Sequence, residues 1–323
     1  MRSIGGTSLG TYPVGTRARV IVALIPCCLS IFIATLYLQV MAGPSSPCPP
    51  FTDAVMYLAA GERLNAGRDL YALHPGDRPV VILPEITTAP LLSPPPIAVL
   101  WRPIAVLPFG FALWIVACWV ALLGTTFHLV LRAGLPGAVL ASLLSPAIGE
   151  QLAAGNVAGF FPLLMVLAWR LRARPVAGAI VGLMASLKLT PGALGGWLVG
   201  TRRWSGVAAA VVAVGLLFVV SLIGSSPAAF VDYLRVATTA GPSTASLSGL
   251  TGLGWLSSCV LVAGTLLAIG LGRWPRAAFI IAVVTSVLGT PSLYLSGWVA
   301  ILATLAPFTD RTSAHVKVIG HEG

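Results

Sequence analysis

The chain has 323 residues, of which 57% are hydrophobic and 9% charged, with a mean hydropathy of +0.94 and a formal net charge of +10. Soluble domains carry about 25% charged residues, so this composition excludes an ordinary soluble enzyme. It also excludes a disordered chain, which needs low hydrophobicity and high charge. The sequence therefore predicts an all-α, polytopic membrane protein that is embedded in a lipid bilayer. We expect its positive charge to mark one side of the membrane and not to bind nucleic acid.

The first apolar run, residues 20–41, is long enough to cross a bilayer as a helix. Arg2, Arg17 and Arg19 precede it. The run is longer than the apolar core of a signal peptide, which has about 7–15 residues. We therefore expect residues 1–19 to form a cytoplasmic N-terminal segment that leads into an uncleaved membrane anchor.

Residues 43–107 form the one long polar segment between apolar runs and are rich in proline. They are expected to be the first extracytoplasmic loop, with interfacial helices. Within the loop, residues 54–64 fit a helix, and Asp53 and Tyr57 share a face because they are four residues apart. One interpretation is that Thr52 or Asp53 only caps this helix. The other is that Asp53 is a functional carboxylate at the lipid–water boundary.

Shorter apolar segments fill the rest of the chain, so we expect about ten transmembrane helices within residues 20–308 and a cytoplasmic tail over residues 309–323. The segments after the loop are residues 109–131, 135–149, 157–169, 176–187, 192–200, 207–223, 250–271, 277–288 and 296–307. If they alternate, 13 basic and 2 acidic groups face the cytoplasm, against 6 basic and 7 acidic groups outside. This asymmetry favours a cytoplasmic N-terminus. Chemistry that needs a carboxylate is then expected on the extracytoplasmic face.

Four polar residues interrupt the apolar pattern on the expected outer side. An ammonium group at membrane depth costs about 2.5–3.5 kcal/mol, so Lys188 is expected to face protein, a polar cavity or an anion. The alternative is a lysine that snorkels to the interface or pairs with a carboxylate such as Glu150. Glu150 and Asn156 lie at another outer turn, where turn formation alone would also explain them. Arg102 lies in an interfacial stretch, where arginine binds phosphate or anchors to lipid headgroups.

The sequence contains neither of the glycine-rich loops that bind nucleotides, and no HExxH or CxxC motif. Cys48 is the one cysteine of the outer loop, so no disulfide framework is indicated. We therefore expect no cofactor and no metal. A carboxylate can act as a base on a sugar hydroxyl while cations stabilise a departing phosphate, which are the parts that glycosyl transfer from a lipid-phosphate sugar requires.

A series of short motifs follows one order along the chain. The motifs are residues 53–60, residues 64–71, Ser93-Pro94-Pro95, Arg102-Pro103, Leu107-Pro108, Leu113-Trp114, residues 154–157, Ala177-Gly178, residues 187–191 and residues 202–204. In this order the chain resembles the membrane glycosyltransferases of the GT-C superfamily, and among them the family 87 group of polyprenyl-phosphate-mannose-dependent mannosyltransferases. The resemblance spans about residues 50–205 and fades after that.

The resemblance implies a GT-C-like fold and an inverting transfer of a sugar, expected to be mannose. The donor would be a polyprenyl-phosphate sugar and the acceptor a lipid-linked or cell-envelope glycan, at the extracytoplasmic face of the cell membrane. Asp53 would be the catalytic base. The expected substrate-binding residues are Lys188, Arg102, Tyr57, Glu150 and Asn156.

The chain also departs from the family pattern. Gly155-Asn156-Val157-Ala158 stands where the family has Gly-Gln-Val-Asn, and residues 290–294 lack the histidine of its late motif. Two other classes of protein therefore stay open. One is a transporter or flippase of polyprenyl-linked substrates, and the other is a non-catalytic member of the family.

Overall fold

The computed structural model describes residues 15–44, 46, 48–75, 81–82, 85–86, 90–239, 241–243 and 245–310. Within these residues the chain is helical apart from one pair of two-residue antiparallel strands, β1 (Val81–Ile82) and β2 (Glu85–Ile86). The all-α prediction is therefore confirmed.

Helices of two kinds, α and 3₁₀, follow one another along the chain. The α-helices are α1 (Thr16–Met41), α2 (Thr52–Asn65), α3 (Pro95–Val106), α4 (Gly110–Ala133), α5 (Leu135–Leu143), α6 (Ser145–Ala154), α7 (Phe161–Arg170), α8 (Val176–Leu187), α9 (Leu194–Gly200), α10 (Trp204–Gly224), α11 (Pro227–Thr239), α12 (Leu247–Thr251), α13 (Leu256–Gly270) and α14 (Pro275–Leu288). The 3₁₀ helices are η1 (Val157–Phe160), η2 (Thr190–Ala193) and η3 (Leu295–Phe308).

Three of the described helices, α1, α4 and α10, are long and apolar enough to cross a bilayer. The pair of α5 and α6 passes the same test when it is taken as one span, although it is bent by 56°. An α-helix of 14 residues covers about 21 Å, less than the hydrocarbon thickness of about 30 Å. The other apolar helices are therefore too short to count as candidate membrane spans by length alone. The described residues hold three or four candidate spans by this measure, and the total of ten stays a prediction.

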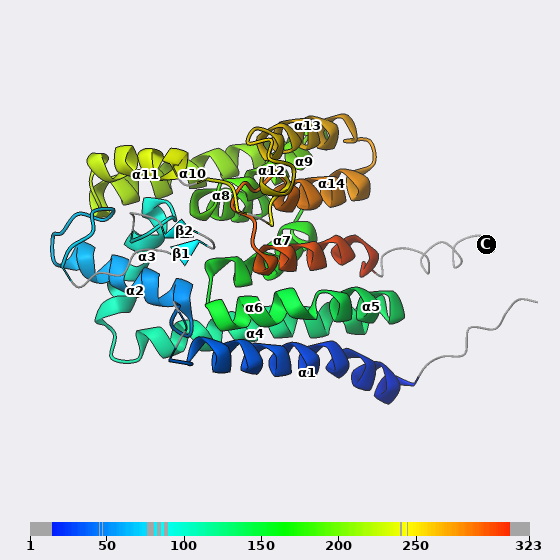
Figure 1. Cartoon of the computed structure of the whole chain (residues 1–323). Coiled ribbons are helices and arrows are strands. Elements are labelled where there is room, and N and C mark those ends of the chain that lie inside the picture. Colours follow the sequence, from blue (N-terminus) through cyan, green and yellow to red (C-terminus); the bar gives the residue numbers. More distant parts are fainter. Residues whose placement is uncertain are drawn as a thin grey trace, which may run out of the picture.

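The helices pack in two layers with two segments between them (Figure 1). One layer consists of α1, α4, α5 and α6, and the other of α8, α9, α10, α13 and α14. Helices α7 and η3 lie between the layers and contact each other. The first residues of α1 and the last of η3 lie at one end of the bundle, whereas α2, α3 and α11 lie at the opposite end.

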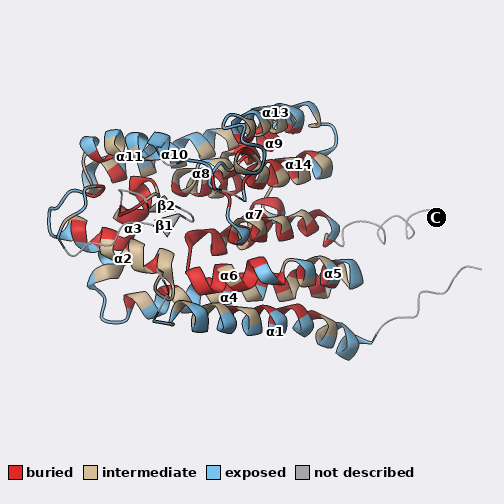
Figure 2. Ribbon diagram, in the orientation of Figure 1, coloured by how far each residue is buried: buried red, intermediate tan, exposed pale blue. Residues whose placement is uncertain are grey.

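Buried residues gather where the layers face each other, and exposed residues cover the outer faces of α1, α10, α11 and α13 (Figure 2). Many of the exposed side chains are large and apolar, among them Phe32 at 61% and Val211 at 66% of full exposure. A soluble protein rarely exposes contiguous apolar surface of this extent. The apolar outer faces fit contact with lipid, so the chain is a membrane protein.

Small residues bring α8 and α10 into close contact. A Cβ atom on Gly178 would lie 1.7 Å from the Gly206 carbonyl oxygen, and one on Gly182 would lie 2.5 Å from the Ala210 oxygen. Glycines four residues apart allow two membrane helices to approach closely. This contact fixes the position of α8, which ends one residue before Lys188.

The structure differs from the sequence-based prediction in several elements. Residues 135–149, expected as one segment, form α5 and the start of α6, because Pro146 in the first turn of α6 lacks the amide that would continue α5. Helix α11 lies between the expected apolar segments, and the expected segment 250–271 forms the end of α12 and the separate helix α13. Helix α1 begins at Thr16, a few residues before the expected apolar run, whereas α2 and α3 lie within residues 43–107, where helices were expected.

Candidate active site

Asp53 lies in the first turn of α2, and it does not cap the helix. The N-cap residue is Phe51, which has a left-handed backbone with φ 57° and makes no side-chain cap hydrogen bond. The Phe51 amide donates to the Ala153 carbonyl oxygen at 2.9 Å, which joins the start of α2 to the end of α6. The interpretation of Thr52 or Asp53 as a simple helix cap is therefore wrong.

The Asp53 carboxylate instead accepts a hydrogen bond from Asn156, 103 residues further along the chain, with 2.9 Å between Nδ2 and Oδ2. Asn156 is itself held in place. Its Oδ1 accepts from the Ala158 amide at 2.8 Å, and its carbonyl oxygen accepts from Gln151 Nε2 at 2.6 Å. These bonds direct the Asn156 amide nitrogen at Asp53.

Gly155 allows the turn that carries Asn156 to approach α2. Its φ is +65°, and a Cβ atom at this position would lie 2.9 Å from the Ala54 Cβ and 2.7 Å from Ile115 Cδ1. The Gly155 carbonyl oxygen also accepts a hydrogen bond from Trp114 Nε1 at 2.8 Å. Any other residue at position 155 would be strained by the positive φ and would collide with Ala54 and Ile115. The Asp53–Asn156 contact therefore depends on glycine at this position.

Lys188 supplies a positive charge to the same end of the bundle. It follows the last residue of α8 with an extended backbone. Burial raises the pKa of the Asp53 carboxyl above its ordinary value, while the Lys188 charge and the Asn156 hydrogen bond act in the opposite direction. Among the described contacts, Asp53 and Lys188 form no direct ion pair.

Glu150 and Tyr294 complete the polar cluster. Ser296, two residues after Tyr294, lies close enough to Glu150 for its backbone and its hydroxyl to favour the charged carboxylate. Burial, followed by the charges of Asp53 and Glu150, raises the pKa of Tyr294 to about 12. Tyr294 was not among the expected site residues. Its place in residues 290–294, directly before the last apolar run, is the sequence signal that could have identified it.

Tyr57 is near Asp53 but belongs to the packed interior. Its residue exposure is 1%, and its ring lies 6.1 Å from Trp101 and 6.4 Å from Trp114 between ring centroids. Trp114 also holds the Gly155 turn, so this aromatic cluster connects α2, α3 and α4 to the site. Tyr57 therefore packs α2 against α3 and α4 and has almost no exposed surface of its own.

Arg102 lies away from the other candidates. Its Nε donates to Asn65 Oδ1 at 3.0 Å and its Nη1 donates to the Gly224 carbonyl oxygen at 2.8 Å. Asn65 is the last residue of α2, twelve residues after Asp53. At about 1.5 Å per residue, the two ends of this helix are about 18 Å apart. Arg102 therefore joins α2 and α3 to the end of α10, and the structure does not bring it to Asp53.

The described residues contain no group of three or more His, Cys, Asp or Glu side chains that could hold a metal ion. The cluster offers a buried carboxylate with a raised pKa, an amide that positions it and an ammonium nearby. This combination suits removal of a proton from a hydroxyl next to a developing negative charge.

The sequence profile described as glycosyltransferase family 87 matches residues 92–314. Asn156, Lys188 and Tyr294 lie inside this match, and Asp53 lies before it. The match corrects the expected extent of about residues 50–205, since it continues through the later helices. No curated protein and no solved structure matches the chain. The profile covers more than half of the chain, which therefore belongs to glycosyltransferase family 87 and is a membrane glycosyltransferase with a sugar donor and an acceptor as substrates.

Proposed function

We propose that the chain transfers mannose, or another hexose or pentose, from a polyprenyl phosphate to a lipid-linked or cell-envelope glycan without a metal ion. The observation that carries this proposal is the Asp53 carboxylate, held at 2.9 Å by Asn156 and under the influence of the Lys188 charge. A membrane-embedded donor also fits a chain whose sequence lacks the glycine-rich loops of nucleotide-binding enzymes.

In the proposed reaction Asp53 accepts the proton of the acceptor hydroxyl. The hydroxyl oxygen attacks the anomeric carbon from the face opposite the phosphate, so the configuration inverts. The bond between the anomeric carbon and the phosphate oxygen breaks, and its electron pair leaves with the polyprenyl phosphate. Lys188 balances the charge that develops on this phosphate. A carboxyl with a raised pKa is the stronger base for this role.

The other polar residues of the cluster have supporting roles in this proposal. Glu150, Tyr294 and Ser296 bind sugar hydroxyls, because they gather around Asp53 from α6 and from the start of η3. Asn156 positions the base. Tyr57 supports α2 from below, and Arg102 fixes the far end of that helix.

Label transfer tests the proposed base and donor. Membranes that contain the full chain receive polyprenyl phosphate carrying labelled mannose, and incorporation into lipid and glycan fractions is measured. Asp53→Asn is expected to lower the rate by about 10²–10⁴-fold, the usual effect of removing a general base. The matched control is Asp232→Asn, an exposed acid of α11 that pairs with Arg235 at 3.1 Å. Its rate is expected to equal that of the wild type.

Two results would contradict the proposal. Equal incorporation by the wild type and by Asp53→Asn would exclude Asp53 as the base. No incorporation by the wild type would exclude this donor. Movement of the labelled lipid across the bilayer without incorporation would then favour a flippase, and the absence of both would favour a non-catalytic member of the family.

We further propose that the Asp53 end faces away from the cytoplasm at the cell membrane, in a chain of ten spans. The arginine-rich turns at the opposite end support this orientation. In a chain without its native cysteines, an impermeant thiol reagent added to intact cells should label Arg235→Cys but not Arg174→Cys, since both positions are exposed at opposite ends. The reverse pattern would overturn the orientation.

A further inference from the structure

Four arginines line a hollow at the end of the bundle opposite Asp53. The hollow has a volume of about 520 Å³, and it is lined by Arg132, Arg170, Arg172, Ala173, Arg203, Thr309 and Asp310. Helices η1 and α7 together lead from Asn156 to Arg170 over 14 residues. This length separates the hollow from Asp53 by about 20 Å, so it is a different site.

The arginines come from the last turns of α4 and α7 and from the turns that follow α7 and α9. Arg132 lies in the last turn of α4, and Arg170 is the last residue of α7. Arg172 lies in the turn that follows α7, and Arg203 lies in the turn between α9 and α10. Basic groups at helix C-termini interact favourably with the helix dipole, which accounts for Arg132 and Arg170 as single residues. It does not account for Arg172 and Arg203, which lie outside the helices.

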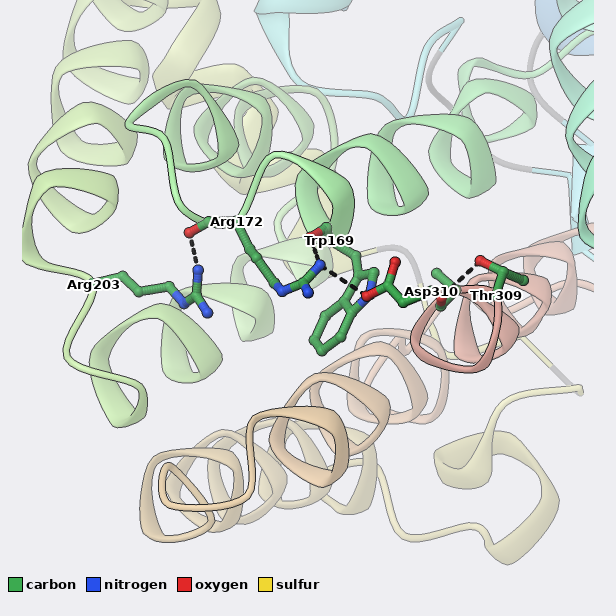
Figure 3. A network of polar contacts seen from close by, with 6 residues as sticks. Trp169, Arg172, Arg203, Thr309 and Asp310 are labelled. Atoms are coloured by element: carbon green, nitrogen blue, oxygen red, sulfur yellow. Dashed lines mark hydrogen bonds and ion pairs between the residues drawn. The ribbon is translucent and has the colours of Figure 1, made fainter. Parts of the chain in front are cut away.

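Contacts with aromatic rings and backbone oxygens fix two of the arginines (Figure 3). Arg172 Nη1 lies 3.0 Å from Asp310 Oδ2, and the guanidinium carbon lies 4.4 Å from the centroid of the Trp169 ring. The Trp169 Nε1 donates to the same Asp310 oxygen at 2.9 Å. Arg203 donates to the Arg172 carbonyl oxygen. Side chains that are already ordered lose less entropy when they bind a ligand.

Positive charge in the hollow exceeds the negative charge that faces it. Its lining has four guanidinium groups and one carboxylate, and that carboxylate is engaged by Arg172 and Trp169. Burial and the neighbouring Arg172 charge lower the pKa of Arg203. Arg132 makes no hydrogen bond or ion pair within the part of the chain that the structure describes. An anion in the hollow would relieve this repulsion.

We propose that the arginine hollow binds a phosphate group, either that of an anionic phospholipid headgroup or that of a soluble phosphorylated molecule. The guanidinium group forms paired hydrogen bonds with phosphate oxygens, which suits arginine to such a ligand better than lysine. The hollow lies at the ends of membrane helices, the depth at which basic pockets meet lipid headgroups. This site is separate from the transfer reaction proposed above.

Binding to defined bilayers tests the proposal. The full chain is placed in nanodiscs of phosphatidylcholine with or without phosphatidylglycerol, and the retained phosphatidylglycerol is measured after purification. Inorganic phosphate and pyrophosphate are titrated separately into the phosphatidylcholine discs by calorimetry. The test variant is Arg132→Gln with Arg170→Gln. The matched control is Arg174→Gln with Arg276→Gln, which removes the same charge from exposed positions outside the hollow.

The wild type and the control are expected to retain phosphatidylglycerol or to bind the soluble anions, and the test variant is expected to bind at least about tenfold less. Retained lipid that phosphate does not displace identifies a headgroup site. Phosphate or pyrophosphate that binds and displaces the lipid identifies a site for soluble phosphates. Equal binding by the test variant and the control, or no binding of any probe by the wild type, overturns the proposal.

A single substitution keeps the test valid if the double variant does not fold. Arg132→Gln removes the arginine that has no partner in the described part of the chain, so the fold should tolerate it. It is expected to weaken binding several-fold in the same assay. Binding by Arg132→Gln that equals the binding by Arg174→Gln would count against the site.

Discussion

Burial raises the pKa of the Asp53 carboxyl, and the Lys188 charge and the hydrogen bond from Asn156 each lower it, so this hydrogen bond contributes to the pH at which the proposed base becomes protonated. Asn156→Ser removes the Nδ2 donor, which lies 2.9 Å from Asp53 Oδ2. Serine is a preferred residue at helix N-caps, so it can retain the bond that Asn156 Oδ1 accepts from the Ala158 amide at 2.8 Å. The substitution therefore separates the contact with Asp53 from the local fold of the turn.

The size of the effect follows from the worth of one hydrogen bond to a charged group, about 1.5–3 kcal/mol. Since one pKa unit corresponds to about 1.36 kcal/mol, the pKa of Asp53 should rise by about one to two units. A base must be deprotonated to act, so activity is lost as the pH falls through this pKa. The acid limb of the kcat/KM profile should therefore move to higher pH by about one to two units in Asn156→Ser.

Initial rates of label transfer measured across the pH range check this shift. Asn65→Ser is the matched control, because Asn65 lies at the other end of α2 and binds Arg102. Its acid limb should coincide with that of the wild type. An unmoved limb in a folded Asn156→Ser would refute the claim that the Asn156 hydrogen bond lowers the pKa of Asp53. An acid limb that persists unchanged in the residual activity of Asp53→Asn would assign the titration to another group.

Three further substitutions test the site and its support. The pKa of Asp53 is raised in the folded chain, so its charged form lowers the stability of the fold above that pKa. Asp53→Asn should therefore raise the melting temperature at neutral pH. This gain should vanish below the unfolded pKa of about 3.9, where the wild-type carboxyl is also protonated. Arg102→Gln should lower the free energy of unfolding by about 1–3 kcal/mol through its lost bonds to Asn65 and Gly224, while the transfer rate per folded chain stays within about threefold. Gly155→Ala should lower the free energy of unfolding by more than about 1–2 kcal/mol and should also lower the rate of label transfer. Gly67 has a similar φ of +64°, but no atom lies within 4 Å of the position that an added Cβ would take, so Gly67→Ala should show the backbone cost alone. Chemical denaturation and label transfer measure these effects, and equal losses at the two glycines would exclude the close contact with α2.

The long membrane helices could be predicted because each is one continuous apolar run. The expected residues 20–41, 109–131 and 207–223 correspond to α1, α4 and α10 with ends that differ by a few residues. Helix α11 was missed because Asp232 and Arg235 interrupt its apolar pattern, and amphipathic helices have no such run. A helix that is apolar along its whole length can be recognised from composition, whether it contacts lipid or the protein interior.

The individual residues of the site could be identified from the sequence, but their arrangement in the fold could not. Asp53 and Asn156 are 103 residues apart, and no sequence spacing connects them. Their contact arises because the start of α2 docks on the end of α6 through the Phe51 amide. Arg102 shows the opposite case, since it lies in the same outer segment as Asp53 but beside Asn65, at the far end of α2. Proximity in the chain and proximity in the fold are independent here.

Folding alone does not account for Asp53. A carboxylate that capped α2 would stabilise the helix, but the structure gives that position to Phe51, without a side-chain cap bond. Burial instead raises the pKa of Asp53, so its charge lowers stability at neutral pH. The chain nevertheless holds this carboxylate with Asn156, whose own bonds to Gln151 and Ala158 leave it one orientation. Helix α8 runs back for about 18 Å from the arginine end and places Lys188 near the same carboxylate. This cost in stability fits the proposed role of Asp53 as the proton acceptor, because groups with perturbed pKa values cluster at functional sites.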